Sequence, residues 1–279
     1  MSAVHPTGSR RLDAAGTVSR IRTIIDKEWA EVFKNRVVLL TVGVMPLVFT
    51  ILPLVILGTM RRSGALSGSG TDVPAGFAGV CGAMSPGDCL QVYVVDQFML
   101  MFMLMPLAIP VAIAAYSIVG EKTTRSLEPL LATPISTEEL LAGKALAAAI
   151  PAVLATWIAF LVFIIGTAIL GVPPAVRAAI ASPTWLIAIL VIGPLMAVLS
   201  VNVAVIVSSR VSDPRAAEQI SMVIIVPVLM VFFAQIAGFL VINARLMGLV
   251  AAGLVLLDLV FIYLGARLFQ RETILTRWK

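Results

Sequence analysis

Charged side chains are scarce in this chain of 279 residues. Asp, Glu, Lys and Arg make up 13% of the sequence, hydrophobic residues make up 60%, and the mean hydropathy is +1.05. Soluble domains carry about 25% charged and roughly 45–50% apolar residues. A soluble fold of this length cannot cover so much apolar surface. The composition therefore excludes the soluble classes and predicts an integral membrane protein.

Several chemical motifs are also absent. The only histidine is His5, which excludes a Ser–His protease arrangement or a His-based metal site in the apolar part of the chain. No G-x-x-x-x-G-K-[ST] loop occurs, so this chain is not expected to bind ATP or hydrolyse it alone. Residues 1–36 contain no short apolar core followed by a small-residue cleavage site, so no removable signal peptide is expected.

Six apolar runs are long enough to cross about 30 Å of hydrocarbon as helices. Their apolar residues do not alternate with period two, which favours helices over a barrel. The runs cover residues 37–59, 94–119, 143–170, 184–209, 219–242 and 246–269. The predicted fold class is therefore an all-α membrane protein with six transmembrane helices. The division between the last two runs stays open, because one long hairpin that re-enters from the outer face is an alternative.

The basic residues predict the orientation. Sixteen of the 20 Lys and Arg residues lie in residues 1–36, in the segment 120–144, in the loop near 210–215 or in the C-terminal tail from Arg267 onwards. Only Arg61, Arg62, Arg177 and Arg245 lie in the other connections. The positive-inside rule then places both termini in the cytoplasm and the chain in the cytoplasmic membrane. Because these residues follow the membrane edge and form no single patch, we expect no nucleic-acid partner.

The chain divides into three regions on this basis. Residues 1–36 form a cytoplasmic tail with an amphipathic helix, residues 37–269 the transmembrane domain, and residues 270–279 a second cytoplasmic tail. In the first region, one helical stripe of apolar residues opposes charged ones. The stripe consists of Val18, Ile21, Ile25, Trp29 and Val32. Such a helix lies at the inner membrane surface, and contacts a partner, anchors the first span, or does both.

The longest outer connection, residues 60–93, contains both cysteines of the chain. It is rich in Gly and Ser and too short for a separate domain. On the outer side of a membrane, Cys81 and Cys89 are spaced for a disulfide, and two free thiols are the alternative. No histidine lies nearby, so a zinc site is not expected.

Residues 120–144 interrupt the apolar runs with charges and two prolines. Pro129 is tolerated in the first turn of a short helix, and Thr133-Pro134 ends that helix. Ser136 and Glu139 then form a capping box that starts the next helix. This predicts a short helix, with Leu127, Leu130 and Leu131 on one face, that docks into another protein. A surface helix resting on lipid headgroups is the alternative.

The same segment resembles the first cytoplasmic loop of ABC-2 type permeases, the membrane subunits of ABC exporters. The matching residues are Glu121-Lys122, Ser126-Leu127-Glu128, Leu130-Leu131, Thr133-Pro134, Ser136 and Gly143-Lys144. Arg125 departs from the pattern, since a small residue is expected there. The tail from Arg267 to Arg277 looks like that of the sodium-extrusion and multidrug branch of the family. Many relatives carry a large outer domain, which this chain lacks.

The resemblance implies a division of labour between subunits. Two permeases, identical or different, would form a dimer in the bilayer, each bound to a separate ABC ATPase subunit that holds ATP and Mg²⁺. The short helix would couple ATP-driven closure of the ATPase to movement of the spans, exporting a substrate. The coupling residues implied are Glu121, Lys122, Leu127, Glu128, Leu130, Leu131, Thr133 and Pro134.

Three polar residues fall inside the apolar runs. Asp258 lies mid-run, and an ionisable residue there faces protein or water. Asn202 and Gln235 are milder cases. All three are candidates for a substrate path, with interhelical hydrogen bonding as the alternative. Asp258 also leaves open an ion-coupled secondary transporter or an intramembrane enzyme, although the latter needs a second carboxylate beside it, and Asp96 is predicted at the outer edge of its span.

Overall fold

The structure is a computed structural model of the chain, and it describes residues 9–34, 36–62, 73–82, 84–123 and 136–268. All regular structure within these ranges is helical, which confirms the all-α prediction. The helices are α1 (Ser9–Val32), α2 (Arg36–Arg62), α3 (Ala75–Cys81), α4 (Pro86–Phe102), α5 (Met105–Thr123), α7 (Thr137–Ile169), α8 (Pro174–Ile180), α9 (Pro183–Ile187), the π-helical η2 (Ala188–Ile192), α10 (Gly193–Arg210), α11 (Pro214–Ser221), the 3₁₀-helical η3 (Met222–Ile225), α12 (Val226–Ile236) and α13 (Ala244–Leu268).

Within the described residues, six helical stretches are long and apolar enough to cross a membrane, as predicted. They cover Val38–Arg62, Pro86–Ser117, Glu138–Ile169, Pro174–Arg210, Pro214–Ile236 and Ala244–Gly265. The second and fourth stretches begin eight to ten residues earlier than the apolar runs suggest. Part of the predicted outer loop 60–93 is therefore helical, since α3 and the first turns of α4 lie within it.

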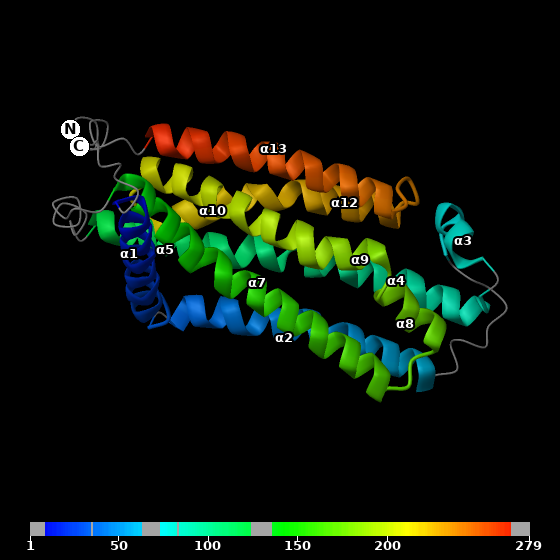
Figure 1. The fold of residues 1–279 in the computed structure, drawn as a ribbon. Coiled ribbons are helices and arrows are strands. Elements are labelled where there is room, and N and C mark those ends of the chain that lie inside the picture. Colours follow the sequence, from blue (N-terminus) through cyan, green and yellow to red (C-terminus); the bar gives the residue numbers. More distant parts are fainter. Residues whose placement is uncertain (1–8, 35, 63–72, 83, 124–135, 269–279) are drawn as a thin grey trace, which may run out of the picture.

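The long helices lie side by side, and α1 crosses one end of the bundle at a steep angle (Figure 1). At this α1 end, α5 and α13 finish and α7 begins, while α3 and α8 lie at the opposite end, the α3 end. The central helix is α10, because it packs against α5, α7, α11 and α13. The large apolar side chains left exposed on α2, α12 and α13 suit a lipid-facing surface.

Prolines set the breaks within the spans. The second stretch turns at Met103–Leu104, directly before Pro106, which has no N–H to continue the ladder of α4. In the fourth stretch, η2 precedes Pro194, and in the fifth, η3 precedes Pro227. Pro110 and Pro151, in contrast, lie inside α5 and α7 without ending either helix.

The η2 segment also frees a carbonyl group for a neighbouring helix. The backbone N–H of Gly193 donates to the carbonyl of Ala188, in the π-helical pattern, and Pro194 has no N–H to donate. The carbonyl of Ile189 is thus left without its regular backbone donors, and the indole Nε1–H of Trp157 on α7 donates to it at 3.0 Å. A side chain of the third stretch thereby satisfies the main chain of the fourth, as hydrocarbon surroundings require.

The link between the last two spans lies close to the predicted division. α12 ends at Ile236, Gly238 turns the chain with φ of 75°, and α13 begins at Ala244. The side-chain oxygen of Asn243 accepts from the backbone N–H of Leu246 at 2.9 Å and so caps the new helix. The two helices are separate, and each stretch is long enough to cross the bilayer.

Candidate functional site

A buried polar network joins α1, α5 and α7 at the α1 end. Lys144 Nζ donates to Glu28 Oε1 at 2.7 Å and to Ser117 Oγ at 3.0 Å. The hydroxyl of Ser117 donates in turn to Glu28 Oε2 at 2.5 Å. The side chains of Glu28 and Lys144 are only 3% and 6% exposed. These three residues, the Glu28 network, connect positions up to 116 apart in sequence.

The charges in this network compensate one another. Burial by itself raises the pKa of Glu28, but the charge of Lys144, the hydrogen bonds from Lys144 and Ser117 and the charge of Lys27 together outweigh it, so this pKa lies below its ordinary value of 4.5. Glu28 is therefore ionised at neutral pH. A buried ion pair is costly to break, because removing either partner leaves the other charge without compensation.

A second connection between α1 and α7 lies closer to the start of α7, at Glu139. The capping box predicted for Ser136 and Glu139 is confirmed: the Ser136 hydroxyl accepts from the Glu139 N–H at 3.1 Å, and the Glu139 carboxylate accepts from the Ser136 N–H at 3.0 Å. The same carboxylate accepts from the Arg20 guanidinium of α1 at 2.6 Å. Glu139 thus fixes the start of α7 and joins it to α1.

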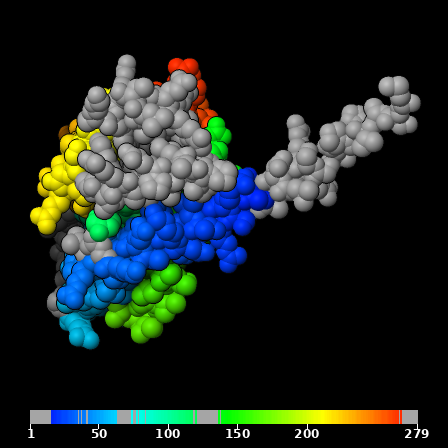
Figure 2. All heavy atoms as spheres, turned by 90° about the vertical axis from the view of Figure 1, so that its left-hand side faces the viewer, coloured from blue at the N-terminus to red at the C-terminus, as the bar shows by residue number. Residues whose placement is uncertain are grey.

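The packing of α1 corrects only part of the predicted stripe. Val32 is buried and Ile21, Ile25 and Trp29 are half-buried, whereas Val18 is 67% exposed. Where burial along α1 is described, the other buried positions are Ile24 and Glu28. The buried face is rotated towards Glu28, because Lys144 compensates the charge that would otherwise keep this residue in water. Figure 2 shows α1, in blue, lying across this end of the molecule. Whether α1 also contacts lipid headgroups stays a prediction.

Close approach of α1 and α7 depends on Gly143. A Cβ at this position would lie 2.8 Å from Cγ2 of Ile24, closer than real Cβ atoms come. Next to this contact, Trp29 Nε1 donates to the carbonyl of Ala147 at 2.9 Å. Gly143-Lys144, which carried part of the family resemblance, therefore has two local roles: the glycine admits α1, and the lysine pairs with Glu28.

The predicted coupling residues are only partly within the described structure. The backbone of Glu121 and Lys122 belongs to the last turn of α5. Leu127, Glu128, Leu130, Leu131, Thr133 and Pro134 lie outside the described residues. The Glu28 network and the capping box therefore flank the segment on both sides, through Ser117 of α5 and Ser136 before α7.

A second buried cluster joins three spans towards the α3 end. Trp185 Nε1 of α9 donates to Asp96 Oδ1 of α4 at 2.7 Å, and Gln235 Nε2 of α12 donates to Asp96 Oδ2 at 3.4 Å. All three residues of this Asp96 cluster are at most 9% exposed. Sequence reasoning singled out Gln235 and Asp96 separately. Nothing local links residues 139 positions apart, so it missed their contact and the role of Trp185.

The other two candidates for a substrate path differ from each other. Asn202 Nδ2 donates to the carbonyl of Val198 within its own helix, at 3.0 Å. Asp258 is 5% exposed, and neither carboxylate oxygen has a hydrogen-bond partner in the described part of the chain. No hydrogen bond among the described residues joins Asp258, Asn202 and Gln235 to one another, and each stays a candidate on its own.

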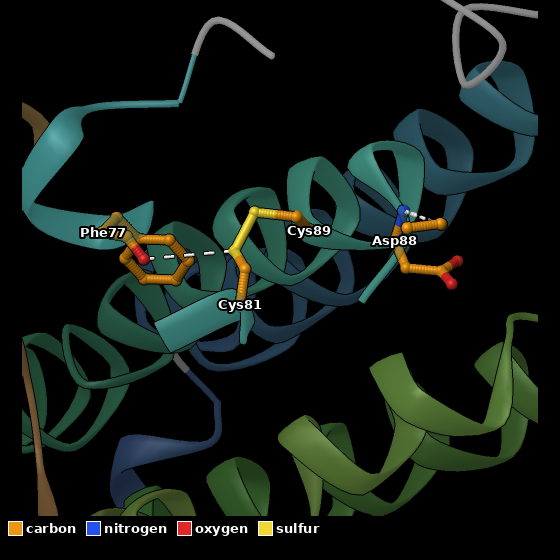
Figure 3. Close-up of a disulfide and its surroundings, with 5 residues drawn as sticks. Phe77, Cys81, Asp88 and Cys89 are labelled. Carbon is orange, nitrogen blue, oxygen red and sulfur yellow. Dashed lines mark hydrogen bonds between the residues drawn. A yellow bond between two sulfur atoms is a disulfide. The ribbon is translucent and has the colours of Figure 1, made fainter. Parts of the chain in front are cut away.

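At the α3 end, a disulfide joins Cys81, the last residue of α3, to Cys89 in the first turn of α4 (Figure 3). The two Cα atoms are 5.3 Å apart, within the range of native disulfides. Cys81 Sγ also lies 4.0 Å from the carbonyl oxygen of Phe77. The Ser85 hydroxyl accepts from the Asp88 N–H at 3.1 Å and so starts α4 inside the bridged loop. The bridge therefore fixes α3 to the second span.

The structure also bears on the alternatives of a metal site and an intramembrane enzyme. Among the described residues, no three His, Cys, Asp or Glu side chains group closely enough to hold a metal ion. The Asp96 carboxylate accepts from Trp185 and Gln235, and no hydrogen bond joins it to Asp258 in the described part of the chain.

Comparison with known families bears on the identity of the chain. The family model described as "ABC-2 family transporter protein" matches residues 22–250, which is most of the chain and includes the second half of α1, the Glu28 network and the segment between α5 and α7. The comparison with curated proteins finds no matching relative. The nearer assignment to the sodium-extrusion and multidrug branch stays a prediction. The chain belongs to the ABC-2 family of transporter proteins and is a multi-pass membrane permease of an ABC transporter.

Proposed function

We propose that this permease works as an exporter whose energy comes from a separate ABC ATPase subunit bound at the segment 120–144. The observation that supports the proposal best is the Glu28 network together with the Arg20–Glu139 pair. Both lie at the α1 end, and both involve α7, which begins within this segment at Thr137. A force applied to the segment would therefore reach several helices at once.

The force would follow a short physical path. α5 ends at Thr123 and α7 begins at Thr137, so a displacement of the intervening residues pulls on both helices. Ser117, Lys144 and Glu28 connect these two helices to α1, and α10 packs against both α5 and α7. Because the helices are long and closely packed, they transmit the movement to the α3 end with little loss.

The remaining parts of the proposal concern assembly and orientation. Two ATPase subunits would serve a dimer of permeases, identical or different, and would bind ATP and Mg²⁺. Both termini and residues 120–144 would be cytoplasmic, in the cytoplasmic membrane, as the distribution of basic residues predicts. Glu121, Lys122 and Glu128 would contact the ATPase at the rim of a groove, with Leu127, Leu130 and Leu131 inside it and Thr133-Pro134 ending the helix.

The orientation is tested by cysteine labelling in intact cells. On a background in which Cys81 and Cys89 are replaced, we expect an impermeant maleimide to label Ser67→Cys, in the outer connection, and not Thr137→Cys. Permeabilising the cells should make Thr137→Cys reactive. Labelling of Thr137→Cys in intact cells, with Ser67→Cys protected, would reverse the proposed orientation.

The partner is tested by purification of the tagged full-length chain from its native cells. We expect an ABC ATPase to co-purify in a roughly one-to-one ratio and to hydrolyse ATP in the complex. Vesicles containing the complex should move substrate only with ATP on the ATPase side. Transport that persists without any ATPase and follows an imposed ion gradient would contradict the proposal and favour the secondary transporter.

A further inference from the structure

One helix of the bundle carries a carboxylate on its packed face. The inward residues of α13 recur at alternating spacings of four and three, which is the pattern of a helix packed lengthwise against a neighbour. They are Met247, Ala251, Leu254, Asp258, Phe261 and Gly265. Most of the residues between them are exposed at the surface of the bundle, for example Leu256 at 66% and Leu259 at 60%. Asp258 is thus directed towards protein and away from the surface of the bundle.

The position of Asp258 is deep along the helix. At a rise of 1.5 Å per residue it lies about 21 Å from Ala244 and about 15 Å from Leu268, near the middle of a bilayer. The elements packed against α13 are α7, α9, η2 and α10. Their charged residues lie at the ends of the helices: Glu138, Glu139 and Lys144 at the start of α7, and Arg210 at the end of α10.

No described group compensates this carboxylate. Both oxygens lack a hydrogen-bond partner in the described residues, although Asp258 is only 5% exposed. The other buried acids differ: Glu28 is paired with Lys144, and Asp96 accepts from Trp185 and Gln235. An uncompensated acid at this depth is costly to the fold and marks a binding position by default.

We propose that Asp258 binds the positive charge of the transported molecule, and that this molecule is an organic cation with a large apolar body. The inference rests on the proposed export function and names its substrate class. Leu254 and Phe261, which flank Asp258 on the same face, are apolar and aromatic. A carboxylate supplies the attraction, Phe261 adds a ring face that favours cations, and the apolar neighbours accept the body.

Inorganic cations fit this position less well. Na⁺, Ca²⁺ and Mg²⁺ are held by several oxygen atoms arranged around the ion. Among the described residues, no three His, Cys, Asp or Glu side chains form a group that could hold a metal ion, and Asp258 therefore has no such pair of ligands beside it. A single carboxylate among apolar side chains suits a delocalised or shielded organic charge, which needs no replacement hydration shell.

The first experiment measures binding to the full-length chain in lipid nanodiscs, without ATP. The probe is tetraphenylphosphonium, a permanent apolar cation, and its neutral counterpart is triphenylphosphine oxide. Asp258→Asn should weaken tetraphenylphosphonium binding at least about tenfold, while Asp258→Glu keeps most of it. Asp26→Asn, an exposed acid on α1, should bind as the unchanged chain does. Binding of the neutral compound should not respond to any of the three changes.

The second experiment uses the unchanged chain, so it does not depend on a variant that folds. Dicyclohexylcarbodiimide, an apolar reagent for carboxyl groups, should modify Asp258, as peptide mass spectrometry would show. Tetraphenylphosphonium should protect Asp258 from modification, and triphenylphosphine oxide should not.

Three outcomes would overturn the inference. They are binding of tetraphenylphosphonium no higher than to empty nanodiscs, equal binding by Asp258→Asn, and protection by Na⁺ in place of the organic cation. Neither experiment requires an ATPase, so failure here is separate from failure of the co-purification test. An ATPase that co-purifies with a chain showing no cation binding would leave the exporter proposal standing and remove only its substrate class.

Discussion

Leu130→Asp is expected to abolish ATP-driven transport while the chain still inserts into the membrane. If Leu130 docks into a groove of the ATPase, the new carboxylate is buried there without a partner, at a cost of about 3–5 kcal/mol. That cost corresponds to a loss of more than about a hundredfold in affinity for the ATPase. Co-purification of the ATPase and ATP-dependent transport in vesicles measure the effect.

The control for this change is Arg277→Asp, at another predicted cytoplasmic position far along the chain. It alters the charge by a larger amount but lies outside the proposed coupling residues, so transport should change little. If Leu130→Asp retains normal ATPase binding and normal transport, residues 127–131 form only a surface connector. If the ATPase stays bound but hydrolysis continues without transport, the segment couples the two subunits without being needed for their assembly.

Lys144→Met is expected to cause the largest loss of stability of any single change at the α1 end. It leaves the Glu28 carboxylate buried and without its main partner, at a cost of about 3–5 kcal/mol. Lys27→Met is the matched control. Lys27 also approaches Glu28, at 3.6 Å, but its side chain is 36% exposed, and exposed ion pairs contribute about 0–1 kcal/mol. Thermal unfolding of the purified chain distinguishes the two.

A double variant, Glu28→Gln with Lys144→Met, should recover much of the lost stability, because neither buried charge then remains. The pH dependence has a definite sign. The pKa of Glu28 is lowered in the folded chain, so its contribution is complete above 4.5 and is lost as the pH falls through the lowered value. This acid-induced loss should be absent from the double variant. Equal stability of Lys144→Met and Lys27→Met would show that the Glu28 network is not a structural element.

The predictions that succeeded from sequence rest on local patterns. The length of each apolar run fixes a span, and the capping box at Ser136 and Glu139 needs only four consecutive residues. The division near Asn243 was left open, and the cap that Asn243 provides for α13 is a local signal that the interpretation of the sequence did not use. Helix starts were placed late at Pro86 and Pro174, because polar residues beyond the apolar runs also continue in helices.

The contacts between distant residues could not be predicted in the same way. The α1 stripe was assigned by apolarity alone and so left out Glu28, whose burial becomes favourable because Lys144 of α7 pairs with it. Asp96 was taken as an edge residue because its apolar run was started at residue 94, whereas the helical stretch begins at Pro86, and its donors come from the distant α9 and α12. One sequence signal was available. Lys144 carries a charge at the start of a long apolar helix, where its burial requires an opposite charge nearby.

The π-helical turn before Pro194 has a consequence for how this protein can vary. The indole of Trp157 has an acceptor only because the proline leaves the Ile189 carbonyl unoccupied. If Ala replaced Pro194, the regular ladder could close and the indole N–H would face hydrocarbon alone. If Phe replaced Trp157, the Ile189 carbonyl would instead lack a hydrogen-bond donor. Substitutions at these two positions, on different helices, should therefore be inherited as a pair among relatives, and either one by itself should be rare.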